Sequence, residues 1–347
     1  MPDLSGATTA RSARGWEGGP VAGKAPRETL HGVELSNLDQ PLFDGAGATK
    51  RDLVEYLDAV HAKMLPGLRD RPLSVVRVRP GQPPFMQKNL PKYTPDWVRS
   101  TTVWAEASHR EINYALCNDL RTLIWFGNQR AVEYHPTLFT DGNWQHPSHL
   151  ILDLDPPDGT EAFDLAVKAA HLVRRALADA GMAGAVKTSG SKGVHVFVPL
   201  DPTDAATPED IAAATRAVAR RAEELDPALA TTAYIKEDRD GKVFLDSTRA
   251  GGATVVAAYS PRVRPDTPVS FPVPWDELDD VSPRDFTVRT AAALLADGRP
   301  DWADLLPGPQ RIDPGLIELG HTIPVARVAA MHEGKRRKRA AEKASRK

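Results

Sequence analysis

The chain has a single cysteine and no long apolar run. One cysteine, Cys117, excludes an internal disulfide framework and a cysteine-ligated zinc site, and it fits a reduced compartment. No apolar stretch reaches the length of a membrane span, and the polar N-terminal residues lack the apolar segment of a signal peptide. We therefore expect a cytoplasmic protein without membrane contact.

The chain also lacks a large excess of either charge, but its charges are unevenly distributed. The formal net charge is -2, whereas residues 335–347 carry eight basic residues and one acidic residue. We expect residues 1–28 to form a flexible leader and residues 331–347 a basic disordered tail. Such a tail can bind nucleic acid through counterion release, or it can be only a solvated end. The rest of the chain is acidic, so any contact with a polynucleotide must come from local patches.

Residues 29–330 are long enough for one large domain. We expect an N-terminal module over residues 29–141, with helices near Thr49–Leu65 and Asn118–Trp125. A second part over residues 142–310 follows the order β-α-β-β-α-β, which is that of the split βαβ, ferredoxin-like unit. The predicted fold class is therefore α/β (α+β).

The strands and helices of the second part can be placed from apolar patterns and caps. Thr160 is expected to cap a helix that stops at Gly181, and Thr207–Pro208 to open another that runs to about Leu225. The strands are expected at Leu150–Asp155, Ala185–Thr188, Val194–Pro199, Ala233–Lys236, Lys242–Asp246 and Thr254–Tyr259. In this unit the first and third strands are central neighbours and the helices cover one sheet face. The other face is left for a site.

Two aspartates lie near the end of the apolar run L-I-L-D-L-D-P-P, which starts at Leu150. Because alternate side chains of a strand share a face, Asp153 and Asp155 point the same way, and His195 of the third strand can join them. Two buried like charges repel each other unless a cation or a proton lies between them. A strand end that runs into solvent would explain a lone D-x-D pattern equally well, so the surroundings decide.

The turn T-S-G-S-K-G-V-H, Thr188 to His195, combines glycines, hydroxyls, a lysine and a histidine. Its backbone N–H groups, its hydroxyls and Lys192 suit phosphate oxygens, although a plain hairpin with a structural histidine has the same composition. A third acid, Asp246, ends the strand V-F-L-D, and three arginines follow at Arg249, Arg262 and Arg264. The joint pattern is more specific than any of its parts.

Three carboxylates, a phosphate-binding turn and arginines are what metal-dependent nucleotidyl transfer requires. Asp153, Asp155 and Asp246 would hold two divalent ions, Mg2+ or Mn2+, about 3.5–4 Å apart. One ion would lower the pKa of an attacking 3′-hydroxyl, and the other would neutralise the triphosphate. The phosphates would be bound by Ser189, Lys192, His195, Arg249 and Arg262.

The motifs D-L-D-P, S-G-S-K-G-V-H-V-F-V-P and V-F-L-D resemble the three catalytic motifs of the archaeo-eukaryotic primase superfamily. The likeness is greatest to the polymerase domain of the bacterial end-joining ligase LigD, and in particular to the stand-alone actinobacterial relatives called Prim-PolC. It covers roughly Leu35 to Pro307. The resemblance implies an archaeo-eukaryotic primase-like catalytic core fused to a smaller N-terminal module, with metal binding by the three aspartates.

The resemblance also implies roles for residues outside the carboxylates. The incoming nucleotide would be contacted by Ser189, Lys192, His195, Arg249 and Arg262, with His135 nearby. Ser189 at the ribose fits a preference for ribonucleotides, and Arg239 would help to seat the primer terminus. The DNA would be contacted by Phe85, which would stack on the template, by Lys88, and by Asn37 and Lys50 at a downstream 5′-phosphate. From the residues alone, Phe85 could instead be a core side chain and Asn37 a helix cap.

Two positions depart from the end-joining family. That family has a lysine three residues after the asparagine, where this chain has Gln40, so the 5′-phosphate pocket loses a charge. It often has a second phenylalanine where this chain has Met86. No ligase K-x-D-G pattern occurs in the sequence, so a DNA ligase and other repair proteins would be separate partners.

The leading hypothesis is a monomeric primase-polymerase, associated with the nucleoid, that adds a few nucleotides, preferably ribonucleotides, at short gaps in duplex DNA. An end-joining polymerase that works with separate Ku and ligase proteins stays open, as does de novo priming. A nuclease or phosphoesterase could use the same carboxylates, but it would hydrolyse DNA and would not need the triphosphate contacts. A binding module with a structural metal would show no turnover.

Overall fold

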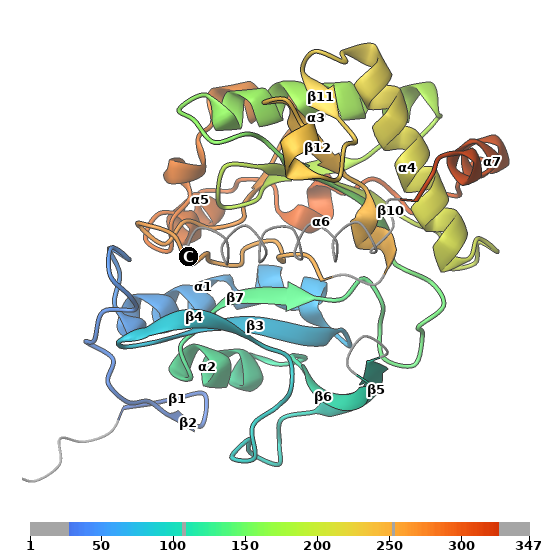
Figure 1. Ribbon diagram of the computed structural model, residues 1–347. Helices are drawn as coiled ribbons and strands as arrows, with labels where there is room; N and C mark the ends of the chain where they lie inside the picture. Colours follow the sequence, from blue (N-terminus) through green and yellow to red (C-terminus); the bar gives the residue numbers. More distant parts are fainter. Residues whose placement is uncertain (1–27, 106–108, 252–253, 326–347) are drawn as a thin grey trace, which may run out of the picture.

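The computed structural model describes residues 28–105, 109–251 and 254–325. The predicted basic tail and all of the predicted leader except Glu28 lie outside these residues. The described chain forms two halves, each built on one β-sheet (Figure 1). Within the described residues, no helix is long and apolar enough to cross a membrane.

The N-terminal half contains a sheet of order β4-β3-β6-β5, with β7 also paired to β3. A short hairpin precedes this sheet, and the helices α1 and α2 pack with it. Helix α1 begins after Thr49, and the side chains of Thr49 and Asp52 form a reciprocal capping box. The two helices predicted in this half are confirmed with slightly shifted ends. The elements are β1 (Thr29–Leu30), β2 (Val33–Glu34), α1 (Lys50–Leu68), β3 (Pro72–Arg79), β4 (Gln82–Gln87), β5 (Ser100–Ala105), β6 (Arg110–Leu116), α2 (Leu120–Asn128) and β7 (Ala131–Pro136).

The C-terminal half contains the predicted β-α-β-β-α-β unit. Its sheet has the order β11-β12-β8-β10-β9-β13, in which β8 and β10 are antiparallel central neighbours, as expected. Strands β9 and β10 and helix α4 have the predicted bounds, and Thr207 caps α4. The elements are β8 (His149–Asp155), α3 (Ala162–Asp179), β9 (Ala185–Thr188), β10 (Val194–Pro199), α4 (Pro208–Leu225), β11 (Ala230–Thr231), β12 (Val243–Asp246) and β13 (Pro272–Val273).

The two faces of this second sheet differ. Leu150, Leu152 and Leu154 are fully buried in the core beneath α3 and α4, and each such side chain contributes roughly 1.5–3 kcal/mol. On the opposite face, Ile151 and Phe197 are covered by a small apolar cluster that includes Leu138. The face that was expected to be open is therefore open only at the end where Asp153 and Asp155 lie.

Two details of the predicted unit are wrong. Thr160 does not cap α3, which begins at Ala162 after Glu161, a residue that makes no capping bond through its side chain. The strand expected at Ala233–Lys236 lies earlier, at β11, and a 3-10 helix occupies Lys236–Asp238. The reason is that the carbonyl oxygens of residues 233 and 234 accept hydrogen bonds from the Arg239 guanidinium, at 3.3 and 3.2 Å, instead of from a neighbouring strand.

The strand expected at Thr254–Tyr259 is also wrong, because this segment belongs to no regular sheet. It runs along β7 of the other half, where the N–H groups of Val255 and Ala257 donate to carbonyl oxygens of β7 at 3.3 and 2.9 Å. The Tyr56 hydroxyl of α1 donates to the Tyr259 carbonyl at 2.8 Å. Residues 254–264, which we call the bridging segment, therefore join the two halves.

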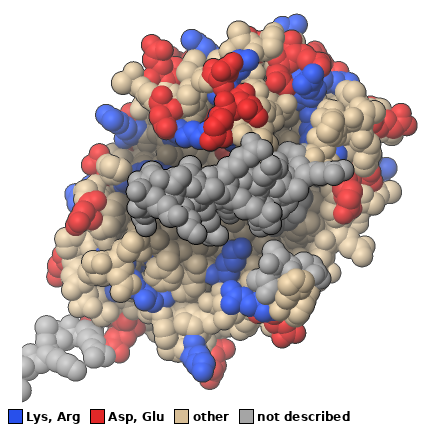
Figure 2. Space-filling model, viewed as in Figure 1, with Lys and Arg blue, Asp and Glu red and all other residues tan. Residues whose placement is uncertain are grey.

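The C-terminal residues close the second half. Helix α7 packs on α4 so closely that a Cβ on Gly320 would lie 1.9 Å from the Ala213 carbonyl oxygen. On the face shown in Figure 2, acidic side chains gather over the C-terminal half, and no uniform basic surface is visible. The remaining elements are the helices α5 (Ala291–Ala296), α6 (Trp302–Leu305) and α7 (Pro314–Thr322) and the 3-10 helices at Thr248–Gly251, Leu278–Asp280 and Pro283–Asp285.

Candidate active site

A polar cavity of about 480 Å3 opens at the uncovered end of the second sheet. It brings together nine of the predicted site residues from β8, β10, β12, the turn before β10, the bridging segment and the loops around β12. These nine are Asp153, Asp155, Ser189, Lys192, His195, Arg239, Asp246, Arg249 and Arg262.

Strand register fixes the positions of the buried polar groups. Asp246 of β12 lies directly opposite Asp153 of β8, and His195 of β10 lies opposite Asp153 on the other side. Residues directly opposite each other on neighbouring antiparallel strands point to the same face, with Cβ atoms about 4.5–5.5 Å apart. Asp246, Asp153 and His195 therefore form one row across three strands, and Asp155 follows Asp153 on the same face.

The guanidinium of Arg249 lies between two of the carboxylates. Its Nη2 donates to Asp153 Oδ2 at 2.9 Å, and its Nε lies 3.3 Å from Asp246 Oδ2. The other oxygen of Asp246 accepts hydrogen bonds from the backbone N–H and the hydroxyl of Thr248. Arg249 thus compensates the two negative charges, and its predicted role at a phosphate stays a prediction.

Asp155 lies at the outer rim of the cavity, where its side chain is about half exposed. It pairs with Arg239 at 3.2 Å and with Lys192 at 3.7 Å, and Lys192 also pairs with Asp158 at 2.8 Å. The Arg239 guanidinium also stacks on the Phe244 ring, 3.9 Å from its centroid. Arg239 and Lys192, both predicted site residues, are thus held at the rim of the cavity by carboxylates.

His195 is held between an acid and a fully buried lysine that sequence reasoning missed. Its Nε2 lies 3.2 Å from Asp153 Oδ1, and its Nδ1 lies 2.8 Å from Lys187 Nζ. Asp153 is ionised and its carboxylate can only accept, so the ring proton lies on Nε2, towards Asp153, and Nδ1 accepts from Lys187. Burial lowers the pKa of Lys187 well below its ordinary value. Lys187 Nζ also donates to the Ser270 hydroxyl at 2.5 Å. The missed signal was the hairpin register, which pairs Lys187 with His195.

These contacts determine the charge states in the row. Burial and the charge of Lys187 lower the pKa of His195 to about 4, so its ring is neutral at pH 7. Burial would raise the pKa of Asp153, but His195 and Arg249 outweigh burial and hold that pKa well below its ordinary value. Asp153 therefore keeps its negative charge inside the protein.

The Gly/Ser turn is pressed against strand β8. The Ser189 hydroxyl oxygen accepts from the N–H groups of Ser191 and Gly193, at 3.2 and 3.1 Å. A Cβ on Gly193 would lie 2.4 Å from the Leu154 carbonyl oxygen, and Gly190 has a positive φ of +68°. Only glycine fits at these two positions, so the spacing of the two glycines in the turn is a steric requirement of the site.

A second missed residue, Glu133 of β7, links the N-terminal half to the cavity. Its Oε1 accepts from the Val263 N–H at 2.8 Å and lies 3.3 Å from Arg262 Nε, and its Oε2 lies 2.8 Å from His135 Nε2. Arg262 also donates to the Ser189 carbonyl oxygen. Glu133 therefore orients two predicted nucleotide ligands. A glutamate two residues before a candidate histidine on one strand was the available signal.

Comparison with known proteins identifies the family. Residues 49–302 match the family model described as "LigD, primase-polymerase domain". The chain belongs to this family. It is 32% identical over 282 residues to the bifunctional non-homologous end joining protein LigD of Bacillus subtilis, a match that covers 80% of this chain and 45% of that protein. It is 35% identical over 277 residues to the multifunctional non-homologous end joining DNA repair protein LigD of Mycobacterium tuberculosis, covering 76% of this chain and 36% of that protein.

A solved structure supports the same assignment. The polymerase domain of Mycobacterium tuberculosis Ligase D in complex with DNA superposes with a TM-score of 0.68 at 31% sequence identity, covering 77% of this chain and 95% of that chain. The predicted archaeo-eukaryotic primase-like fold and the predicted resemblance to the LigD polymerase domain are confirmed. The chain spans less than half the length of the curated LigD proteins that it matches.

Of the predicted DNA contacts of this LigD-family chain, Arg239 lines the cavity, whereas Phe85, Lys88, Asn37 and Lys50 lie outside it. Register places Met86 of β4 and Glu133 of β7 on either side of Val76, so both point to the face that meets the C-terminal half. Phe85 points to the other face, where the Arg79 guanidinium lies 4.7 Å from its ring centroid. Met86 is 46% exposed, Phe85 is half-buried, and Lys88 is exposed just beyond β4. Template stacking by Phe85 stays a prediction.

Asn37 and Lys50 lie together at the start of α1. Asn37 is exposed with a φ of +53°, and the Lys50 ammonium donates to the Ser36 carbonyl oxygen at 2.5 Å. Asn37 is the N-cap of none of the α-helices in the described residues, and α1 is capped by Thr49, so the alternative that Asn37 is a helix cap is wrong. A 5′-phosphate role for Asn37 and Lys50 stays a prediction.

Glu133→Gln should destabilise the protein in a pH-dependent way. Burial would raise the pKa of Glu133, but His135 and Arg262 lower it from 4.5 to about 2. A depressed folded-state pKa means that the carboxylate stabilises the fold above about pH 4.5 and that this contribution is lost as the pH falls towards 2. We expect the variant to unfold with about 2–4 kcal/mol less free energy at pH 7.

Urea unfolding at pH 7 and at pH 3 measures this difference. The difference in the free energy of unfolding between the wild type and Glu133→Gln should be smaller at pH 3, because glutamine resembles the protonated acid. Glu111→Gln, on the exposed part of β6, is the control and should change little at either pH. A free-energy difference of the same size at both pH values would contradict the ion pairs assigned to Glu133.

Proposed function

We propose that the protein is a template-directed nucleotidyltransferase that extends a primer across short gaps in duplex DNA, preferably with ribonucleotides. Membership of the LigD primase-polymerase family supports a polymerase. The observation that carries the proposal is the row of Asp246, Asp153 and His195 beside the Ser189 turn and Arg262, in one polar cavity. Carboxylates for metal ions and donors for phosphates thus face the same space.

The donor set fits hard divalent cations. Within the part of the chain that the structure describes, no three acidic, histidine or cysteine side chains stand in the arrangement of a preformed metal site. The carboxylates of Asp153 and Asp246 nevertheless already hold a cationic group between them, the Arg249 guanidinium. Asp153, Asp155 and Asp246 offer only oxygen ligands, which Mg2+ and Mn2+ prefer. When bound, such ions would neutralise triphosphate charge and lower the pKa of a 3′-hydroxyl.

The side chains around the carboxylates would bind and orient the nucleotide. Arg262, fixed by Glu133 and the Ser189 carbonyl, would offer its guanidinium to phosphate oxygens. Lys192 would bind the outer phosphates after leaving Asp158, an exposed partner that costs little to replace. Neutral His195, with its proton on Nε2, would keep Asp153 oriented and ionised. Ser189, whose oxygen is fixed by two N–H groups, would face the ribose.

Primer extension on a labelled duplex with a short gap tests the proposal. The reactions would contain Mn2+ and either ribo- or deoxyribonucleoside triphosphates. We expect products longer by one or a few nucleotides, with ribonucleotides used faster. Shortening of the labelled strand would overturn the proposal in favour of a nuclease, and an unchanged strand would favour a binding module.

The names of the relatives favour a second candidate, an end-joining polymerase that works with a separately supplied ligase. The matched proteins of Bacillus subtilis and Mycobacterium tuberculosis are both named for non-homologous end joining. Two duplexes with short complementary 3′ overhangs would distinguish the candidates. An end-joining enzyme should fill in across the paired overhangs as fast as across a gap, whereas a gap-repair enzyme should act only on the continuous gapped duplex.

A further inference from the structure

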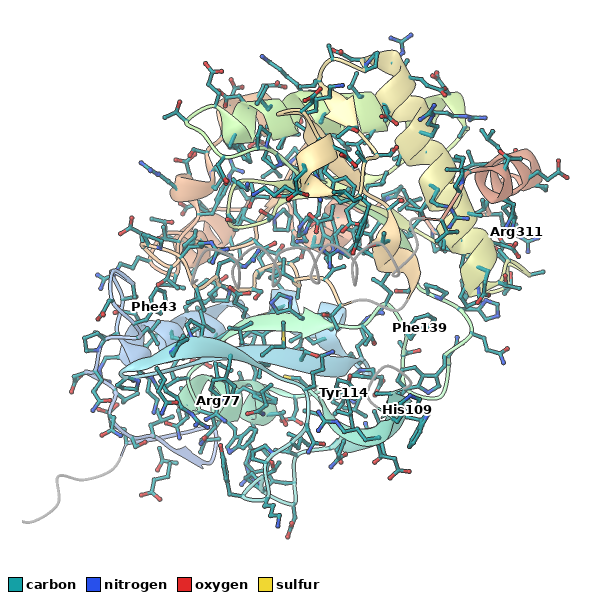
Figure 3. All side chains as sticks on the ribbon, in the orientation of Figure 1. Phe43, Arg77, His109, Tyr114, Phe139 and Arg311 are labelled. Atoms are coloured by element: carbon teal, nitrogen blue, oxygen red, sulfur yellow. The ribbon has the colours of Figure 1, made fainter. Side chains whose placement is uncertain are left out.

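A second cavity, of about 210 Å3, lies where the two halves of the molecule meet, and it shares no described lining residue with the polar cavity. Helix α1 and the chain just before β3 wall it on the N-terminal side, and β8, β10 and α6 wall it on the C-terminal side, with the bridging segment between them. Figure 3 labels Phe139, which lies next to this cavity on the chain that runs from β7 to β8. The side chains that line the cavity include Met64, Arg71, Leu138, His149, Phe197 and Trp302.

The lining is mostly apolar, but it contains one cation, Arg71, that pairs with no acid within the described residues. The Arg71 Nη1 donates to the Thr137 carbonyl oxygen at 3.2 Å, and within that part of the chain the guanidinium makes no other hydrogen bond or ion pair. Burial lowers the pKa of Arg71, and no carboxylate acts to raise it. Asp301, the one carboxylate among the described lining residues, pairs with Lys63 at 2.5 Å and caps α6. The lining therefore carries an excess of one positive charge.

His149 gives the cavity an uncharged acceptor. The Ser148 hydroxyl has a single proton, which it donates to the Leu138 carbonyl oxygen at 3.0 Å, so its oxygen accepts from His149 Nδ1 at 2.8 Å. The ring proton therefore lies on Nδ1, and Nε2 keeps its lone pair. Burial and the charge of Arg71 lower the pKa of His149 to about 3, so the ring is neutral at pH 7.

Two aromatic rings form part of the apolar wall. The Phe197 and Trp302 rings stand perpendicular to each other with centroids 5.3 Å apart, and the Trp302 backbone N–H donates to the Tyr259 hydroxyl at 2.8 Å. Protein interiors contain few voids larger than a water molecule, and voids that stay empty are apolar. This cavity instead combines apolar walls with a few fixed polar groups, which is the composition of small-molecule sites.

We propose that this cavity binds a small aromatic carboxylate, with its carboxylate on the Arg71 guanidinium and its ring against Phe197 and Trp302. A guanidinium fork matches the two oxygens of a carboxylate, and the excess positive charge favours an anion over a neutral ligand. His149 adds no negative charge, and its Nε2 can accept from a hydroxyl or N–H group on the ring. Because both halves contribute walls, the ligand contacts both of them. The site is independent of the proposed polymerase function.

Methyl NMR of the full-length protein, labelled with 13C at the methionine methyl groups, tests this site without catalysis. Benzoate is the probe, and nitrobenzene is its neutral isostere. We expect benzoate to shift the Met64 methyl signal saturably, because Met64 lines the cavity, and to leave the signal of exposed Met86 unchanged. Nitrobenzene should bind about tenfold more weakly, because it carries no charge for the guanidinium to bind.

Arg71→Gln should weaken benzoate binding about tenfold and leave nitrobenzene binding as in the wild type, so that the preference for the anion disappears. The nitrobenzene shift at Met64 shows in the same variant that the cavity is still folded. Arg69→Gln is the matched control and should keep the preference, because Arg69 is exposed at the C-cap of α1 and does not line the cavity. No saturable shift at Met64, equal binding of the two probes by the wild type, or an unchanged preference in Arg71→Gln would overturn the assignment.

Discussion

Asp153→Asn should lower primer extension by about 1000-fold or more, because metal ions contribute several kcal/mol to such reactions and an amide is a poor ligand for them. The same is expected of Asp246→Asn. Asparagine has the size of aspartate and keeps one acceptor oxygen, which can serve His195 or Arg249 but not both, so the fold and duplex binding should be largely kept. Single-turnover extension rates, together with duplex affinity and Tm, measure the effect.

The control is an acid on the opposite side of the same sheet. Asp164 is exposed in the first turn of α3, which covers the leucine face, and Asp164→Asn should leave extension unchanged. Extension by Asp153→Asn within about tenfold of the wild type would mean that the carboxylate row is not the catalytic centre.

Gly193→Ala should damage both the fold and the site. The added Cβ would lie 2.4 Å from the Leu154 carbonyl oxygen, which belongs to the central strand and cannot move away easily. The turn must therefore lift off β8 and carry Ser189 and Lys192 with it. We expect a loss of about 1–3 kcal/mol in the free energy of unfolding, and a rise of about tenfold or more in the KM for the nucleotide. Urea unfolding and extension kinetics check the two effects.

The same substitution at another glycine should act in the opposite direction. Gly67 lies in the last turn of α1, and a Cβ added there would have no atom within 4 Å outside the helix backbone and the neighbouring residues. Gly67→Ala should therefore stabilise the protein slightly, by about 0.5–1 kcal/mol, and leave the KM unchanged. If Gly193→Ala behaves like Gly67→Ala, the close packing of the turn on β8 is wrong.

Local sequence signals predicted the ferredoxin-like unit well. The bounds of β9 and β10 follow from the glycine-rich turn between them, and α4 begins at a capping box that the sequence shows directly. The segment at Thr254–Tyr259 looks like a strand because of its valines, but its backbone partner is β7, which is more than a hundred residues earlier in the chain. No local pattern carries that information.

For the site, too, local sequence patterns predicted some residues, whereas residues with partners distant in sequence were missed. The period of two along β8 and β10 was enough to place Asp153, Asp155 and His195 on one face. Glu133 was missed because its partner Val263 is distant in sequence. The resemblance supplied Phe85 as a stacking residue, whereas the register of β4 turns Met86, not Phe85, towards the C-terminal half.

The assignment of the three carboxylates as the metal site is tested most directly by anomalous diffraction from crystals of the protein with a gapped duplex, Mn2+ and a non-hydrolysable ribonucleoside triphosphate. We expect manganese at Asp153, Asp155 and Asp246, with the triphosphate against Ser189, Lys192 and Arg262 in the polar cavity. Manganese away from these three carboxylates, or a triphosphate bound outside the cavity, would contradict it.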